Sequence, residues 1–293
     1  MELNSASMMK VATQESLTLI EQTFAAHFPA ESTDFIDRVF ERVDDLFEGR
    51  YSGYQSSDTT YHDFTHTCEA TVAVVRILDG HIRGEEPPAL GHRDFELMVV
   101  ASFLHDSGFI KEIGDDEGTG AKYTVTHVQR SGQFTANFLE EFDVTADEIH
   151  LIQLAIECTG IQVDVNSLAF GNELGRFMGS VVGTGDILAQ MAAPDYPEKL
   201  DGLYREFAEA STYPGAQGSG IDTYTSANDL MRKTRGFYDG YVLHMLETQW
   251  GGVYHSLERH FEEGKNEYFQ SIDANLERID RMFLSTEAPT EPV

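Results

Sequence analysis

Apolar residues recur along most of the chain at spacings of three and four positions, which is the periodicity of an amphipathic α-helix. Sustained alternation of apolar and polar residues, the pattern of a half-buried strand, is scarce. The pattern therefore predicts an all-α protein. The predicted helices cover residues 15–27, 33–48, 65–79, 93–105, 123–141, 146–157, 171–192, 198–211, 226–233, 236–262 and 266–284.

Residues typical of helix N-termini and the composition of the loops support this division of the chain into helices. The segment 32–34, Ser-Thr-Asp, precedes the second predicted helix, and Thr145 opens the sixth. Gly, Pro and acidic residues gather in the segments that join the helices. We expect a single all-α domain over residues 1–285, followed by a disordered tail over 286–293. The predicted loops are 49–60, 80–92, 110–120 and 212–222.

The chain is strongly acidic, with 50 acidic against 20 basic residues and a formal net charge of −30. A surface this acidic repels nucleic acid polymers and anionic membranes, so neither is expected as a partner. A small phosphorylated substrate is compatible with this charge if cations neutralise its pocket. The simpler interpretation is that the acidity serves solvation or salt tolerance.

Other features concern the compartment of the protein. No apolar stretch approaches the roughly 18 residues that span a membrane. Residues 1–10 do not place a basic region before an apolar segment, as a signal peptide would. Cys68 and Cys158 lie in apolar contexts and are expected to be reduced thiols, with a disulfide as the alternative. These features favour a cytoplasmic location.

Histidine and aspartate recur at inward-facing positions of three predicted helices. His66, His105 and Asp186 each share a helix face with apolar residues, which predicts that their side chains point toward the core. Asp106 follows His105 directly, and His62 precedes His66 by one helical turn. Because burial of an unpaired carboxylate costs several kcal/mol, these side chains suit the ligands of a divalent metal held between helices.

Each of these residues also has a simpler explanation when it is taken alone. A single histidine on an apolar face is most often hydrogen-bonded within the core. Asp106 is placed to open a turn, and Asp186 follows a Gly-Thr-Gly segment, where it is placed to cap a helix. One shared site is the more economical explanation of all four residues in this order.

The candidate residues belong to longer motifs. These are Tyr-His-Asp-Phe-Thr-His at 61–66, Leu-His-Asp at 104–106, a helix bearing His127, Ala-Ile-Glu-Cys-Thr at 155–159 and Gly-Asp-Ile-Leu at 185–188. In these motifs the chain resembles the HD-domain superfamily of metal-dependent phosphohydrolases, which includes the cyclic-nucleotide phosphodiesterases. The resemblance spans about residues 60–190. It implies a single HD-domain helical bundle with additional N- and C-terminal helices.

The resemblance also implies a metal site. The implied ligands of a first divalent metal are His66, His105, Asp106 and Asp186. Asp106 would bridge this ion to a second one, which makes it both a ligand and a catalytic residue. Imidazole and carboxylate ligands suit Mn, Fe, Zn or Ni, with Mg also suited to the second position. One or two such ions activate water and stabilise phosphoryl oxygens.

Two further histidines carry implied roles. In the phosphodiesterases, the histidine at the position of His62 protonates the leaving oxygen, and here Asp63 replaces the Asn that usually follows it. This carboxylate either raises the pKa of His62 or orients its ring. His127 is implied as a ligand of the second metal, with a phosphate contact or a helix-start residue as alternatives. The cyclic-dinucleotide subgroup is disfavoured, because Glu-Cys-Thr at 157–159 replaces its further histidines.

Basic and aromatic residues elsewhere are candidates for substrate contacts. Lys122 flanks the acidic loop 114–120, which is either a mobile lid over the site or simply a solvated loop. Arg232 and Lys233 either contact phosphate or complement the C-terminal end of a helix. Four aromatic residues either line a nucleobase pocket or belong to the core. They are Phe237, Tyr238, Tyr241 and Trp250.

We therefore expect a metal-dependent hydrolase of a small-molecule phosphate ester, with a nucleotide as the first choice of substrate. The motifs do not separate a phosphodiesterase from a phosphomonoesterase. One alternative is a di-iron oxygenase of the HD type, whose ligand spacing overlaps with this one. Another is a non-catalytic regulatory module that binds a metal and a nucleotide. The oligomeric state is not set by any of these features.

Overall fold

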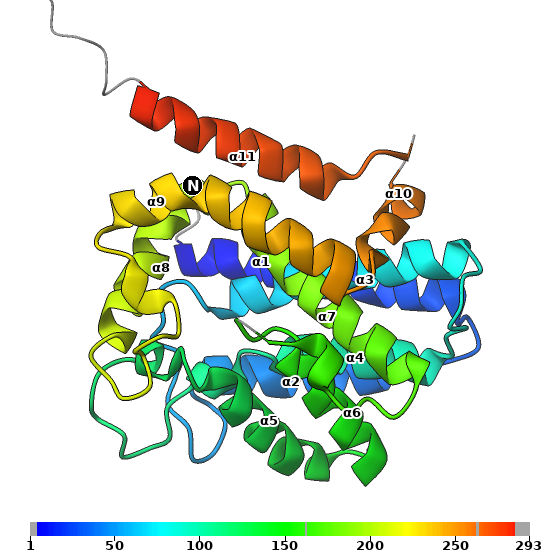
Figure 1. Ribbon diagram of the computed structural model, residues 1–293. Helices are drawn as coiled ribbons and strands as arrows, with labels where there is room; N and C mark the ends of the chain where they lie inside the picture. The colour runs from blue at the N-terminus through cyan, green and yellow to red at the C-terminus, as the bar shows by residue number, and fades with distance from the viewer. Residues whose placement is uncertain (1–4, 162, 262–263, 285–293) are drawn as a thin grey trace, which may run out of the picture.

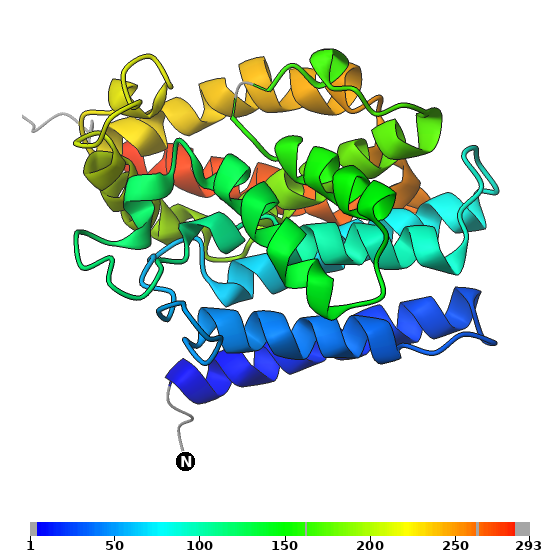
Figure 2. The same ribbon diagram turned by 90° about the horizontal axis from the view of Figure 1, so that it is seen from below.

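Helices build the protein, as Figures 1 and 2 show. The computed structural model describes residues 5–161, 163–261 and 264–284. Within these ranges no strand forms, and an isolated bridge joins Tyr54 to Glu112. The prediction of an all-α protein is confirmed. The α-helices are α1 (Ser5–His27), α2 (Asp34–Phe47), α3 (Phe64–Arg83), α4 (His92–Leu104), α5 (His127–Phe138), α6 (Ala146–Glu157), α7 (Glu173–Ala192), α8 (Tyr196–Ala210), α9 (Ala227–Phe237), α10 (Leu257–His260) and α11 (Glu267–Leu284).

Shorter 3₁₀ and π segments connect or extend these helices. The 3₁₀ turns are η1 (Ser107–Phe109), η2 (Gly120–Tyr123), η3 (Leu139–Glu141), η4 (Val165–Ser167), η5 (Ile221–Thr223) and η8 (Val253–Ser256). The π segments are η6 (Tyr238–Val242) and η7 (Met245–Gln249).

The predicted helix over 123–141 is shorter in the structure. Its first residue belongs to the separate turn η2, and α5 begins only at His127. The hydroxyl of Thr124 donates to the carbonyl oxygen of Ala121 at 2.7 Å. Such local bonds from a side chain to the backbone compete with regular helix formation.

The two helices predicted over 226–233 and 236–262 are one continuous helical segment as far as Gln249. It runs from α9 through η6 and η7 without a break. Gly251 and Gly252 then end it with φ angles of 63° and 72°, a left-handed conformation that favours glycine. The chain beyond them forms η8 and the single turn α10.

Helices α3 and α7 lie in the middle of the molecule (Figure 1). Figure 2 shows α1 and α2 on one face and the long segment that begins with α9 on the opposite face. The buried apolar residues form a core that extends from Leu17 in α1 to Ile279 in α11. The candidate ligands on α3, α4 and α7 therefore lie on central elements.

Two glycines allow close approaches that bring the candidate site together. A Cβ atom at Gly185 would lie 2.5 Å from Val74 Cγ2, so α7 packs on α3 at a distance that no larger residue permits. A Cβ atom at Gly108 would lie 2.0 Å from the carbonyl oxygen of His127, so η1 packs against the start of α5. These contacts draw α3, α5 and α7 around the end of α4.

Three further predictions concern the two cysteines, membrane-spanning helices and the C-terminal tail. Cys68 and Cys158 are buried, and among the described residues neither forms a disulfide, as predicted. No helix in the described part of the chain has the length and apolarity needed to cross a membrane. The tail predicted to be disordered, 286–293, lies outside the described residues.

Candidate metal centre

The four predicted metal ligands come from three central helices. His66 lies in the first turn of α3, where its backbone N–H donates to the N-cap side chain of Asp63 at 2.9 Å. His105 and Asp106 follow the last residue of α4. Asp186 lies in the interior of α7, so the alternative that it caps a helix is wrong. Asp106 does open the turn η1, but its carboxylate faces the imidazole of His105.

The reactive atoms of these four side chains converge on one point. His66 Nε2 lies 3.1 Å from Asp186 Oδ1 and 3.6 Å from Asp106 Oδ2. His105 Nε2 lies 3.2 Å from Asp106 Oδ2 and 3.6 Å from Asp186 Oδ1. Three of the residues, His66, His105 and Asp106, are buried and each offers a ligand atom within 4.8 Å of the others. This buried group is able to hold a metal ion.

Two atoms of the group are buried without a hydrogen bond. His105 Nδ1 donates to the carbonyl oxygen of Ser102 at 2.7 Å, which leaves Nε2 facing the carboxylates. His105 Nε2 and Asp106 Oδ2 have no hydrogen-bond partner among the described residues. Buried polar atoms are nearly always paired, so such orphaned atoms require an explanation. Imidazole nitrogen and carboxylate oxygen are common ligands of divalent metals, and a cation between them would satisfy both.

Both carboxylates of the group are ionised at neutral pH. Burial opposes their ionisation, but the neighbouring imidazoles of His105 and His66 outweigh it and hold the pKa values of Asp106 and Asp186 well below the ordinary value. The same carboxylates raise the pKa of His105 against the effect of burial. The site is thus charged to attract a cation, which would take the place of the imidazole proton.

His127 lies on the other side of the Asp106 carboxylate. Its Nε2 is 3.8 Å from Asp106 Oδ1, and its Nδ1 donates to the carbonyl oxygen of Thr124 at 2.7 Å. Burial lowers the pKa of His127, which favours the neutral imidazole that a metal ligand requires. His127 is also the first residue of α5. The assignment of His127 to a second metal stays a prediction. The position of His127 beside Oδ1 of Asp106 is compatible with that assignment.

His62 is held by an acidic residue that the motifs do not contain. Its Nδ1 lies 2.6 Å from Oε2 of Glu206, a side chain of α8 that is only 3% exposed. Burial opposes protonation of His62, but the Glu206 carboxylate outweighs it and raises the pKa of the imidazole to about 9. The sequence does contain a signal for Glu206, because it lies on the apolar face of α8 beside Leu203 and Phe207.

A phenylalanine at the edge of the site packs against both histidines, whose own ring centroids are 6.3 Å apart. The ring of Phe109 stacks on His62 with centroids 4.4 Å apart and planes at 15°. The same ring also stacks on His127, with centroids 4.4 Å apart and planes at 19°. Phe109 is 1% exposed, so both imidazoles rest against a ring that is itself fixed in the core.

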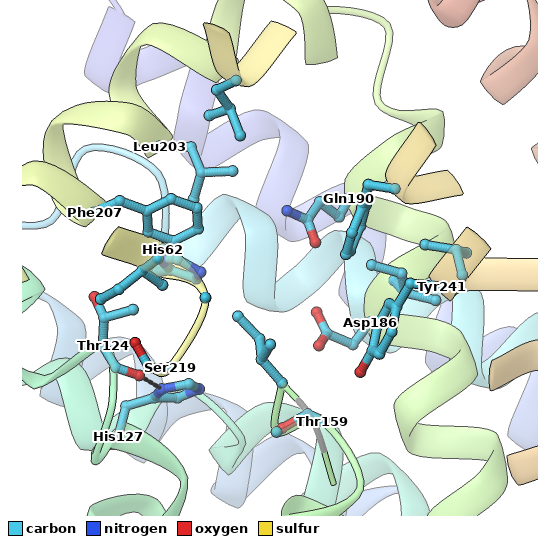
Figure 3. A pocket seen from close by; sticks show the side chains of 18 of the residues that line it. His62, Thr124, His127, Thr159, Asp186, Gln190, Leu203, Phe207, Ser219 and Tyr241 are labelled. Carbon is cyan, nitrogen blue, oxygen red and sulfur yellow. Dashed lines mark hydrogen bonds between the residues drawn. The ribbon is translucent and has the colours of Figure 1, made fainter. Parts of the chain in front are cut away.

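A cavity of about 340 Å³ opens beside the metal group. Figure 3 shows Asp186 and Tyr241 on one side of this space and His62, Phe207 and His127 on the other. The polar end contains His62, Asp106, His127 and Asp186. The remainder is lined mainly by apolar and aromatic side chains. Its volume falls at the lower end of the range for small-molecule sites, roughly 300–1,000 Å³.

The three predicted substrate-binding cations are not among the residues that line this cavity. Lys122 forms an ion pair with Asp115 of the acidic loop. Lys233 Nζ lies 2.8 Å from Asp229 on its own helix. The guanidinium of Arg232 lies over the ring of Phe283, 4.0 Å from its centroid.

The structure also shows where the aromatic candidates and the acidic loop lie. Of the four aromatic residues named from the sequence, Phe237, Tyr241 and Trp250 line the cavity, whereas Tyr238 is buried elsewhere in the core. The acidic loop 114–120 is tied to α8, where Thr119 donates from its backbone and its hydroxyl to Glu209.

The interpretation of the metal centre depends on the chemistry of its own residues. A scan against protein-family models finds no match to the chain, and a search of curated proteins finds none either. The described residues contain a buried His-His-Asp group that is able to hold a metal ion, beside a cavity large enough for a small molecule.

Proposed function

We propose that the protein is a metal-dependent hydrolase of small phosphate esters and a member of the HD-domain superfamily that its motifs resemble. One observation carries the proposal. The buried atoms His105 Nε2 and Asp106 Oδ2 have no hydrogen bond among the described residues, and Asp106 and Asp186 line the same cavity as His62. A cation site and a proton donor therefore face the same space.

The residues present fit a divalent metal. His66, His105, Asp106 and Asp186 would hold a first ion, and Asp106 with His127 would contribute to a second. When bound, such an ion supplies Lewis acidity that activates water and offsets the charge of phosphoryl oxygens. The net charge of −30 makes this contribution necessary, because the rest of the protein repels an anionic substrate.

His62 supplies the proton that the leaving group needs. Glu206 occupies its Nδ1, so Nε2 is the nitrogen left to serve the cavity. In the reaction, the oxygen of water bonds to phosphorus and one proton of that water passes to solvent, while the ester P–O bond breaks and the proton of His62 Nε2 passes to the leaving oxygen. The products are an alcohol and a phosphate, or a phosphomonoester when the substrate is a diester, and solvent then reprotonates His62. A general acid of this kind contributes about 10²–10⁴-fold in rate.

A test compares the protein with its His105→Ala variant. Protein supplied with Mn²⁺, Fe²⁺, Zn²⁺ or Ni²⁺ is assayed on a panel of phosphomonoesters and phosphodiesters, and bound metal is measured by elemental analysis. The unchanged protein should release phosphate or alcohol, and His105→Ala should lose both metal and activity. His150→Ala, at an exposed position of α6, is the matched control. A folded His105→Ala variant with full activity would refute the proposal.

A second candidate function is favoured by one observation. None of the cavity-lining residues in the described part of the chain is a lysine or arginine. An HD-type di-iron oxygenase needs no cationic contacts to phosphate, and His127 stands where a second iron would require a ligand. Oxygen uptake and a visible iron absorption, without release of phosphate from any ester, would favour this reading.

A further inference from the structure

Much of the cavity wall beside the metal group is aromatic. This part includes Phe207, Tyr224, Phe237, Tyr241 and Trp250, which we call the aromatic half. Phe207 stacks on Tyr224 with centroids 5.9 Å apart, and Phe237 stacks on Tyr241 at 5.2 Å. Four of these five rings therefore lie in two pairs, in which each ring helps to fix the position of the other.

The aromatic half begins one helical turn from a metal ligand. A Cβ atom at Gly183 would lie 2.7 Å from both Cε2 and Cζ2 of Trp250, so the indole packs directly on the backbone of α7. Asp186 follows three residues later, a rise of about 4.5 Å along the helix. A group attached to a phosphoryl oxygen at the metal end must therefore extend toward these rings.

The cavity offers no compensation for additional negative charge. Among the described residues that line it, the charged or ionisable groups near the metal end are two histidines and two aspartates, and none is lysine or arginine. The protonated His62 serves the phosphoryl group at the metal end, so a second phosphate would be buried without a further cation from the described lining residues, which is costly. The charge of the site thus suits a single phosphoryl group.

The polar side chains of the cavity are largely engaged already. The hydroxyls of four lining residues each donate to the carbonyl oxygen three residues earlier, at 2.6–2.8 Å. These residues are Thr124, Thr159, Ser219 and Thr223. A nucleobase or a sugar would bury several donors and acceptors here without partners.

The aromatic half contains a buried donor without a hydrogen-bond partner. Trp250 is 4% exposed, and its Nε1 has no hydrogen-bond partner among the described residues. A ligand with a single acceptor near this indole would satisfy it. Apart from this indole, the phenols of Tyr224 and Tyr241 and the amide of Gln190, the lining of this part is mainly apolar, which suits a largely apolar body with few polar groups.

We infer that the substrate is a monophosphate ester of an apolar alcohol, whose hydrocarbon body occupies the aromatic half. The phosphoryl part of this inference rests on the proposed function, whereas the apolar body rests on the cavity alone. A nucleoside monophosphate or diphosphate is the competing class.

The chain provides its own probe, because Trp250 is its single tryptophan. The intrinsic fluorescence of protein supplied with Zn²⁺ is titrated with cyclohexyl phosphate, AMP and ADP, and that of metal-free protein with cyclohexanol. We expect cyclohexanol to shift the Trp250 emission saturably without metal. In readings taken within the first turnover, cyclohexyl phosphate should bind at least ten times more tightly than AMP, and ADP should bind most weakly.

Two results would overturn the inference. One is tighter or equal binding of AMP or ADP, and the other is the lack of a saturable response to cyclohexanol. Failure of the proposed function looks different, because the expected order of binding would then hold while no ester is hydrolysed. Hydrolysis of AMP with the reversed order would support the proposed function and refute the apolar body.

A pair of exposed isoleucines provides matched variants. Ile161 lines the cavity and is 51% exposed, whereas Ile113 is 71% exposed and lies outside it. Ile161→Lys adds a cation at the rim and should reduce the preference for cyclohexyl phosphate over ADP at least fivefold. Ile113→Lys should leave the preference unchanged. Equal effects of the two substitutions would contradict the assignment.

Discussion

Glu206 Oε2 lies 2.6 Å from Nδ1 of His62, across 144 positions of sequence, and the side chains of Glu206 and His62 are 3% and 15% exposed. Glu206 also accepts a hydrogen bond from the backbone N–H of Tyr61 at 2.5 Å. The carboxylate thus holds both the ring of His62 and the chain that precedes α3. The charge of this pair determines over which pH range His62 carries a proton.

The first prediction concerns the pH dependence of activity. His62 keeps its proton up to a pKa of about 9, so activity that depends on this proton should fall only above that pH. Glu206→Gln removes the charge that offsets burial, and the basic limb of the pH–rate profile should move down to about 6.5 or lower. Glu209→Gln, one turn away on α8, is the control and should keep the limb in place. An unchanged profile in Glu206→Gln would exclude His62 as the general acid.

The second prediction concerns stability. Because the pKa of His62 is raised in the folded state, the stability from its protonation is complete below pH 6.5 and is lost as the pH rises through about 9. His62 lowers the pKa of Glu206 against the effect of burial, so the corresponding stability is lost as the pH falls below the ordinary glutamate range. Glu206→Gln should thus cost on the order of 2–3 kcal/mol near neutral pH and much less at about pH 10.

Urea unfolding of both proteins at several pH values measures this difference. A cost that stays constant over the whole pH range would show that Glu206 contributes through packing and not through its charge.

The third prediction concerns the metal. Loss of an outer hydrogen-bonding partner typically lowers metal affinity by about 10–100-fold, so loss of a direct ligand in Asp186→Asn should lower it by at least about 100-fold. At a metal concentration about 100 times the Kd, binding stabilises the unchanged protein by about 2.7 kcal/mol. In Asp186→Asn at the same concentration this stabilisation should fall to about 0.4 kcal/mol or less.

Thermal unfolding with and without Zn²⁺ measures the effect, and Asp116→Asn in the exposed acidic loop is the matched control. If Asp186→Asn and the unchanged protein gain the same stability from the metal, Asp186 is not a ligand.

The fourth prediction concerns the approach of α3 and α7. In Gly185→Ala the new methyl group would lie 2.5 Å from Val74 Cγ2 and 3.2 Å from the carbonyl oxygen of Ala70. The substitution should therefore destabilise the protein by about 1–3 kcal/mol or more and separate His66 from Asp186. In Gly236→Ala, within α9, the methyl group meets nothing within 4 Å, and a gain of up to about 1 kcal/mol is expected. Urea unfolding of the two variants should thus give opposite signs, and a neutral Gly185→Ala would contradict the close packing.

The inward direction of the ligands was predictable from the sequence. His66, His105 and Asp186 share their helix faces with apolar residues, and helical periodicity is a local property that sequence spacing encodes. Only the three-dimensional packing could decide between the alternatives for Asp186, because a Gly-Thr-Gly segment is compatible with either a helix start or a helix interior.

The role of the basic residues, in contrast, was not predictable from the sequence. Lys122 and Lys233 were candidates for substrate contacts, but each is paired with an acidic residue near it in the chain. In a chain with 50 acidic residues, a surface cation meets a carboxylate close by more readily than it reaches a distant cavity. Sequence position alone does not distinguish these outcomes.

The sequence by itself determined the helical class, the position of most helices and the inward phase of the histidines and aspartates, because each depends on residues only a few positions apart. The tertiary structure alone decided that Glu206 meets His62, that Trp250 packs on Gly183 and that the cavity beside the metal group is aromatic and without lysine or arginine in the described residues. The physical reason is that these contacts join helices far apart in the chain. They depend on how closely backbones approach at glycines such as Gly185, which local periodicity does not encode.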